Sequence, residues 1–194
     1  MQRILILNGS PQGKKGNCAV LAQKITALLP KQVSSSVTNL SDVLAKPSSL
    51  SALKQKFKKA DAVIFLTGTY WDSWGSPLQK FLEDITALEA TPELMGKPCA
   101  VFVLMHSVGG KGVLSRLQGV LSTMGLLIPP MSGMVYSLTA DLALKAGAHE
   151  QEADFWQLDD IHRILKNLLL STQIKVAWTA WPVDKDDPRR RWLR

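Results

Sequence analysis

The feature that most constrains the fold is a regular alternation of short apolar runs with longer amphipathic stretches. Three runs, at 3–7, 62–66 and 99–105, are almost wholly apolar, and each ends in a polar or glycine-rich loop. Such runs are typical of strands that are buried on both faces of a sheet. Apolar residues recur between them at helical spacing, as in 20–29. The alternation therefore predicts an α/β fold in which a parallel sheet is covered by helices on both faces.

Weaker signals supply the remaining elements. A polar, β-branched segment at 33–40 and a pair of short apolar segments within 126–136 complete a set of five predicted strands. Pro30 and Gly125 are placed to end the first and fourth helices. The predicted helices cover 20–29, 50–59, 77–85, 113–124 and, as a long last helix, Phe155 to Leu168.

The chain has 194 residues, which suits one well-packed domain. We expect that domain to cover residues 1–172. Residues 173–194 differ in character, because they contain three tryptophans, Trp178, Trp181 and Trp192, and the basic run 189–191. We expect this segment to be an extended tail that packs on its own domain or on a partner subunit.

Composition excludes several classes of protein. No apolar run approaches the roughly 20 residues that a membrane-spanning helix needs. Two cysteines, Cys18 and Cys99, form neither a metal-binding motif nor a disulfide framework, so we expect no metal and a cytoplasmic location. The net charge of +7 is scattered along the chain, and few aromatic residues lie among the basic ones, so we expect no nucleic-acid partner.

Three loops carry the functional signal, because three strong strands deliver them to the carboxyl edge of the predicted sheet, where ligands bind in folds of this kind. The first loop, 9–18, is glycine-rich and leads from a buried strand into a helix. The N–H groups at the start of that helix suit a phosphate. The spacing of Gly9, Gly13 and Lys14 is not that of a P-loop. An ordinary glycine-rich turn is the alternative.

The second loop, 67–77, contains the adjacent aromatic residues Tyr70 and Trp71. These side chains could flank a flat ring, or they could simply pack over the next helix. The third loop, 106–112, could form a backbone-lined wall for the same ring, or it could be a helix entry with a solvated His106.

Taken together, the motifs in these loops resemble those of the NAD(P)H-dependent FMN reductase family. The resemblance lies between Arg3 and Pro130, and its motifs are Gly9-Ser10-Pro11, Gly16-Asn17, Tyr70-Trp71, the segment 78–84 and Gly109-Gly110. It implies a flavodoxin-like three-layer sandwich with strand order 2-1-3-4-5. By the resemblance, the residues at FMN phosphate positions are Ser10, Gln12, Gly16, Asn17 and Cys18. Those near the isoalloxazine ring are Tyr70, Trp71, Asp72, Ser73, His106, Ser107, Gly109 and Gly110.

The resemblance further implies an oxidoreductase that passes a hydride from NAD(P)H through bound FMN to a small acceptor, which could be a quinone, a nitro or azo compound, a ferric chelate or free flavin. The flavin carries the chemistry, so no protein side chain is expected to act as acid or base. Backbone N–H groups near 72–73 and 109–110 would stabilise the negative charge that reduction develops on the ring. The family also implies a homodimer or homotetramer.

Two other functions stay open. A flavodoxin-type electron carrier is usually acidic, whereas this chain is basic. A flavodoxin-like binding or regulatory module that has lost its flavin is the other, since Gln12 stands where the family has arginine and Cys18 where it has threonine or serine. Cys18 itself could be a reactive thiol at a helix N-terminus, but a small residue that fills space is the preferred interpretation.

Overall fold

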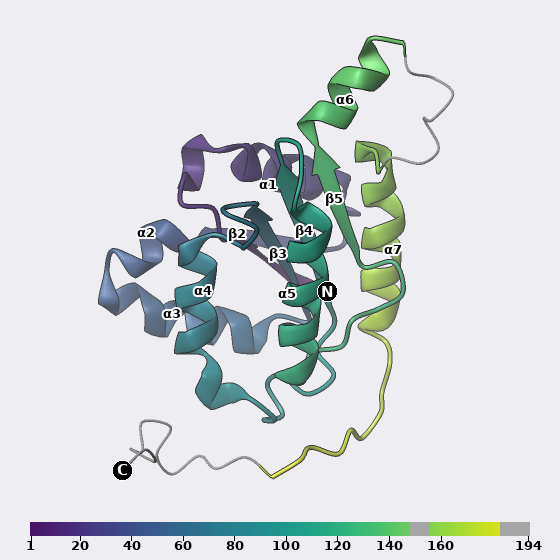
Figure 1. Ribbon diagram of the computed structural model, residues 1–194. Helices are drawn as coiled ribbons and strands as arrows, with labels where there is room; N and C mark the ends of the chain where they lie inside the picture. Colours follow the sequence, from purple (N-terminus) through teal and green to yellow (C-terminus); the bar gives the residue numbers. More distant parts are fainter. Residues whose placement is uncertain (148–155, 183–194) are drawn as a thin grey trace.

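The computed structural model describes residues 1–147 and 156–182. Within them, five parallel strands form one sheet in the order β2-β1-β3-β4-β5, which confirms the predicted flavodoxin-like topology. Figure 1 shows the sheet between its two layers of helices. The strands are β1 (Arg3–Asn8), β2 (Ser34–Asn39), β3 (Ala62–Gly68), β4 (Cys99–Met105) and β5 (Gly133–Ser137).

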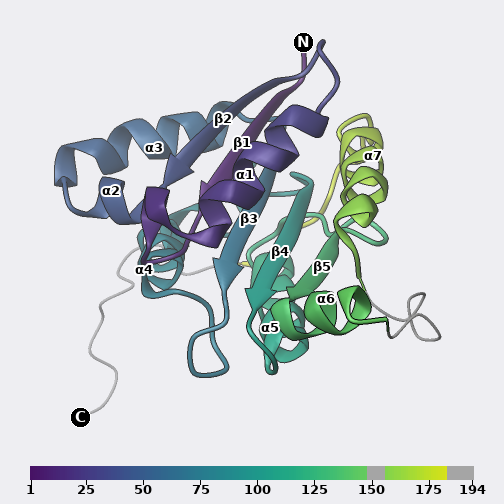
Figure 2. The ribbon, with the colours of Figure 1, turned by 90° about the horizontal axis from the view of Figure 1, so that it is seen from above.

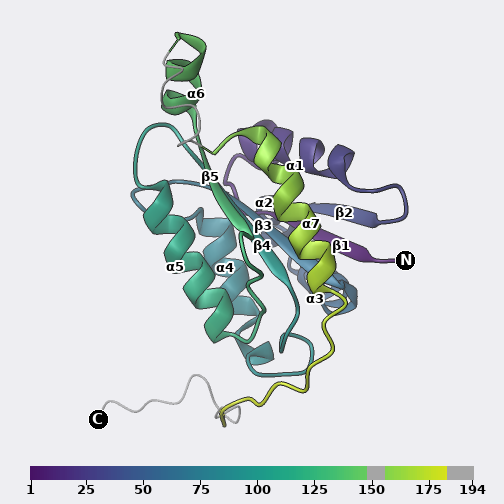
Figure 3. The same ribbon diagram turned by 90° about the vertical axis from the view of Figure 1, so that its right-hand side faces the viewer.

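The helices form a layer on each face of the sheet (Figures 2 and 3). One layer holds α1 (Asn17–Leu28) and α7 (Ile161–Ser171), and the other holds α3 (Pro47–Lys59), α4 (Ser76–Asp84) and α5 (Gly110–Thr123). The first and fourth predicted helices end where expected, since α1 stops before Pro30, and Gly125 follows α5 with φ +110°. Within the described chain, no helix is long and apolar enough to cross a membrane.

Strands β1, β3 and β4 are almost wholly apolar because their alternate side chains enter two separate cores. In β1, Leu5 and Leu7 pack beneath α3, α4 and α5, whereas Ile4 and Ile6 pack beneath α1 and α7. The same alternation holds in β3, where Phe65 is fully buried. Burial of both faces leaves no room for polar side chains until the strands reach their carboxyl ends.

Three helical features differ from the sequence-based expectation. The last helix begins at Ile161, after the 3-10 turn Leu158–Asp160, so it is shorter than predicted, and its predicted start at Phe155 lies outside the described residues. Two helices were not anticipated, α2 (Leu40–Leu44) and α6 (Leu138–Lys145). Helix α6 projects from the carboxyl edge of the sheet (Figures 1 and 3), and none of its residues is buried. A helix without a buried face has no hydrophobic periodicity by which to find it.

The described part of the tail, 173–182, passes the other edge of the sheet, at the amino ends of the strands (Figure 1). The Trp178 indole lies against Gly96, where an added Cβ would meet Nε1 at 2.4 Å. Trp178 and Trp181 both stay about half exposed. The tail therefore makes a contact with its own domain, far from the three loops, while Trp192 and 189–191 lie outside the described residues. The division at residue 172 stays a prediction.

Candidate functional site

The first loop is organised by Asn8, a buried amide at the carboxyl end of β1. Its Nδ2 donates to the Gly13 carbonyl at 3.0 Å and to Asn39 Oδ1 at 2.8 Å, and its Oδ1 accepts from the Ser10 N–H at 3.0 Å. These three bonds hold the loop in the curve that leads into α1. Asn8 was not among the site residues expected from the sequence, although a polar amide at the end of an otherwise apolar strand is visible there.

The N-terminus of α1 presents free donors at the end of this loop. Within the described chain, the N–H groups of Asn17 and Cys18 make no hydrogen bond, as is usual in the first turn of a helix. The side chains of Gln12 and Asn17 are exposed beside them. Gly16 lies so close to Gln12 that an added Cβ would be 2.6 Å from the Gln12 Cβ. The arrangement suits an anion that the backbone can approach closely.

Cys18 points away from this anion site and into the core between α1 and the sheet. Burial raises the pKa of the Cys18 thiol to about 12, although a hydrogen bond with Ser10 opposes the shift. The thiol is therefore protonated at neutral pH, and the interpretation of Cys18 as a reactive thiol is wrong. Cys18 is a small buried residue that leaves only its backbone N–H at the site.

The second loop contains a two-residue hairpin. Tyr70 and Ser73 exchange backbone hydrogen bonds of 2.8 and 2.9 Å, and between them Trp71 and Asp72 both adopt positive φ, at +49° and +55°. Tight hairpin turns need this conformation, but residues other than glycine are strained in it. Because the Ser73 N–H donates to Tyr70, it is not free to stabilise charge on a ring, so this part of the expectation is wrong.

The aromatic residues of the second loop have three different roles. Trp74 packs on the core, and its Nε1 donates to Gln79 Oε1 at 2.9 Å. Trp71 is fully exposed, so the interpretation that it packs over the next helix is wrong. The Tyr70 ring lies against Gly68, and its hydroxyl is 2.9 Å from Ser10 Oγ in the first loop. Tyr70 thus links the two loops.

Close backbone contacts bring the three loops together at the carboxyl edge (Figure 2). A Cβ added to Gly75 would lie 2.3 Å from the Gly9 carbonyl oxygen, which places the first and second loops in contact. The Thr67 hydroxyl accepts the Gly75 N–H at 2.9 Å and fixes this approach. A Cβ added to Gly109, which has φ +85°, would lie 2.1 Å from Asp72 Oδ1, so the second and third loops also touch.

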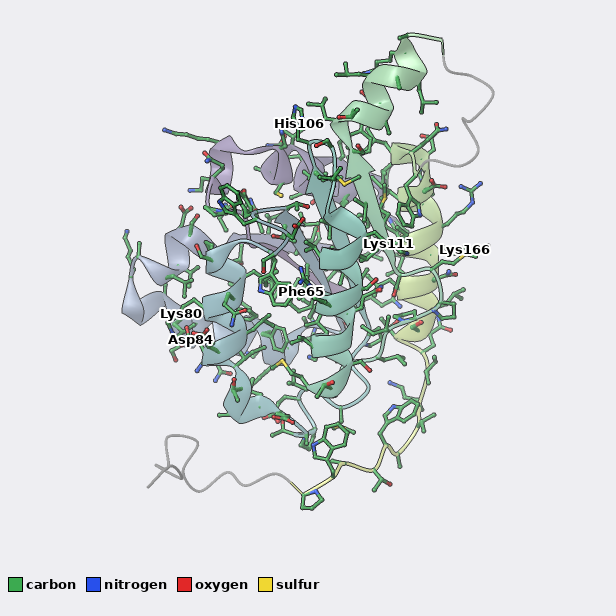
Figure 4. All side chains as sticks on the ribbon, in the orientation of Figure 1. Phe65, Lys80, Asp84, His106, Lys111 and Lys166 are labelled. Atoms are coloured by element: carbon green, nitrogen blue, oxygen red, sulfur yellow. The ribbon has the colours of Figure 1, made fainter. Side chains whose placement is uncertain are left out.

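The third loop ends β4 and begins α5. The His106 carbonyl accepts from the Thr139 N–H at 3.0 Å and from Thr139 Oγ1 at 2.8 Å, so it anchors the start of α6 (Figure 4). The side chains of His106 and Ser107 are exposed. The N–H groups of Gly109 and Gly110 bond to no described residue, which leaves them as donors for a ring.

A comparison with known protein families shows to which family the chain belongs. The sequence model of a family described as NADPH-dependent FMN reductase matches residues 2–140. The chain belongs to this family. Its cofactor is therefore FMN, with NAD(P)H as reductant, as the motifs of the loops predicted. No curated protein sequence matches the chain.

Solved structures of flavoproteins have the same fold. RosB with a bound riboflavin phosphate intermediate is 14% identical, with a TM-score of 0.73, and the match covers 100% of this chain and 96% of RosB. The apo form of the NADH:FMN oxidoreductase EmoB is 19% identical, with coverage of 87% and 90% and a TM-score of 0.66. FerB from Paracoccus denitrificans is 21% identical, with coverage of 66% and 75% and a TM-score of 0.56. At these identities the similarity concerns the fold.

The residues present fit FMN in chemistry and in position. A phosphate needs donors, and the first turn of α1 offers the free N–H groups of Asn17 and Cys18. A ring needs a wall with few side chains, and Gly109 and Gly110 provide one in the third loop. The Ser10 hydroxyl, by contrast, is already engaged with Tyr70. Contacts of each residue with FMN remain predictions.

We expect Trp71→Ala to change flavin binding without a change in stability. Because the side chain is fully exposed, its removal should alter the free energy of unfolding by no more than about 0.5 kcal/mol. If Trp71 flanks the ring, the flavin absorbance band and the FMN affinity should both shift. Trp181→Ala, at the other edge of the sheet, is the control. Identical flavin titrations for the two variants would remove Trp71 from the site.

Proposed function

We propose that the chain passes two electrons from NAD(P)H to a small aromatic or chelated acceptor at the carboxyl edge of its sheet. Its family supports the coarser statement, a flavin-dependent oxidoreductase. The observation that carries the proposal is the convergence of three loops, of which the first and third leave N–H groups, at Asn17, Cys18, Gly109 and Gly110, without a hydrogen bond to a described residue. A quinone, a nitro or azo compound, a ferric chelate and free flavin are the candidate acceptors.

Each loop has a separate task in this proposal. The first turn of α1 holds the FMN phosphate, with Gln12 and Asn17 as side-chain donors. Gly109 and Gly110 donate to the pyrimidine edge of the ring and stabilise negative charge there. Tyr70 and Trp71 border the ring from the second loop. FMN held there would supply the redox chemistry, the transfer of two electrons from the nicotinamide to the acceptor.

The yellow colour of bound flavin, and the loss of that colour on reduction, test this function. Purified protein, reconstituted with FMN and freed of excess, should be yellow, and NADPH or NADH should bleach it without another enzyme. A yellow protein that neither nucleotide bleaches would fit the electron carrier instead. A protein that retains no FMN would fit the binding module. The net charge of +7 already disfavours the carrier.

Asn17→Ala should weaken FMN by removing a donor at the phosphate. The expected loss is about 1 kcal/mol for a partly exposed, charge-assisted bond, and riboflavin, which lacks the phosphate, should lose nothing. Titration of the FMN-free protein with both ligands measures this. Gln23→Ala, at an exposed position further along α1, is the control. An equal loss for both ligands would show that Asn17 does not contact the phosphate.

The family resemblance and the tail together support a homodimer or homotetramer. Ile174, Val176, Trp178 and Trp181 each leave about half of an apolar side chain exposed, and an interface would cover them. We expect truncation after Thr172 to lower the mass measured by light scattering. Because the tail lies at the amino edge, turnover per subunit should persist. An unchanged mass would exclude the tail from the interface.

The cysteines are consistent with a reducing compartment. Cys18 and Cys99 are both free and buried, and they lie in different cores of the domain. We therefore propose a cytoplasmic location.

A further inference from the structure

A cavity lies beside the third loop, between α5 and the projecting helix α6. It measures about 360 Å³, which is within the range of small-molecule sites. Met105 and Val135, at the carboxyl ends of β4 and β5, lie on one side, and Ala140 and Ala143 of α6 lie on the other. Trp156 and Lys111 complete the walls. The described lining is mostly apolar and contains no carboxylate.

Lys111 and Trp156 form the distinctive pair in this cavity. The Lys111 amine lies 4.9 Å from the centre of the Trp156 ring, in a cation–π contact. In the described part of the chain, no carboxylate oxygen comes within 4.0 Å of this amine. Lys111 is also the second residue of α5, at the positive end of the helix. The cavity thus joins an aromatic face to a positive charge that no described carboxylate neutralises.

The cavity is next to the proposed ring site rather than part of it. Ser107 of the third loop lines it, and Gly110, the first residue of α5, lies against Met105 and Val135 in its wall. A ligand held here would therefore lie directly behind the loop that borders the flavin ring. Neither Lys111 nor Trp156 was singled out as a site residue by the sequence, because 45 positions separate them.

We propose that this cavity binds an aromatic anion of one or two rings. Its ring lies on Trp156, and its carboxylate or sulfonate pairs with the Lys111 amine. The third loop lies between this ligand and the flavin ring, so the site does not rest on the proposed function.

Direct binding tests the site without turnover. The probes are 2-naphthoate and its neutral analogue 2-naphthalenemethanol, titrated by calorimetry into the full-length protein with and without FMN. The wild type should bind the anion about tenfold more tightly than the alcohol. Lys111→Met should abolish that preference, and Trp156→Leu should weaken both probes. Lys166→Met, on the outer side of α7 (Figure 4), should change neither.

The outcomes separate the two proposals. Retention of the anion preference by a folded Lys111→Met protein, or the absence of naphthoate binding to the wild type, would overturn the site. A Lys111-dependent site in a protein that does not bind FMN would uphold the site and refute the proposed function.

Discussion

Gly75→Ala should disrupt the candidate site severely. The added Cβ would lie 2.3 Å from the Gly9 carbonyl oxygen and 2.8 Å from Pro11 Cδ, and neither backbone nor proline ring can rotate away. The first and second loops must therefore separate. We expect a loss of about 1–3 kcal/mol in the free energy of unfolding, typical of overpacking, and a strong loss of FMN affinity. Turnover should fall about 100-fold, as displacements near 1 Å do in other sites.

Gly119→Ala provides the matched control for this substitution. Gly119 lies in the middle of α5, is exposed, and has no atom within 4 Å of an added Cβ. Alanine should stabilise the helix there by up to about 1 kcal/mol. Chemical denaturation and FMN titration of both variants give the comparison. If Gly75→Ala binds FMN as well as Gly119→Ala does, the contact between the loops does not shape the site.

Lys97→Met should destabilise the domain at the opposite edge of the sheet. The Lys97 amine donates to the carbonyl oxygens of Phe57, Lys58 and Ala60, at 2.9, 3.1 and 2.7 Å, and so caps the C-terminus of α3. It also lies 5.6 Å from the centre of the Phe57 ring. Removal of the amine leaves these carbonyls without that donor, which should cost about 2–3 kcal/mol in the free energy of unfolding. Lys59→Met, on the exposed side of the same helix end, is the control.

The effect of Lys97 should depend on pH in a defined direction. Burial lowers the pKa of Lys97 from 10.5 to about 8. Between these values the unfolded chain binds the proton more tightly than the folded one, so the contribution of Lys97 to stability rises with pH. The difference in stability between the wild type and Lys97→Met should therefore widen from pH 8 to pH 10. A constant difference would show that the three carbonyls keep the amine charged despite its burial.

The parts of the fold that burial dictates were predictable from the sequence. β1, β3 and β4 are buried on both faces, so their residues are apolar without interruption, and their order of appearance leads to a parallel sheet. Helix α6 was not predictable in this way, since it has no buried face. The glycines of the three loops were visible, but the contacts that make them necessary were not, because Gly9 and Gly75 are distant in sequence.

The same distinction holds for individual side chains at the site. The sequence identified Tyr70 and Trp71 as aromatic residues near a ligand, but the positive φ angles that turn Trp71 outward follow from the hairpin. It could not show that Ser10 bonds to Tyr70, or that Asn8 organises the first loop. Such roles depend on the distances between loops, and hydrophobic periodicity carries no information about them.

The two separate cores also affect how this domain responds to its ligand. The first loop leads into α1, on one face of the sheet, whereas the second and third lead into α4 and α5, on the other. A ligand held by all three loops is released when the helices of either layer separate from the sheet. Its binding free energy therefore opposes the opening of each layer. At a free FMN concentration 100 times Kd, mass action adds about 2.7 kcal/mol to each opening that releases the ligand. Amide hydrogen exchange in α1 and in α5 should therefore slow together as FMN is added.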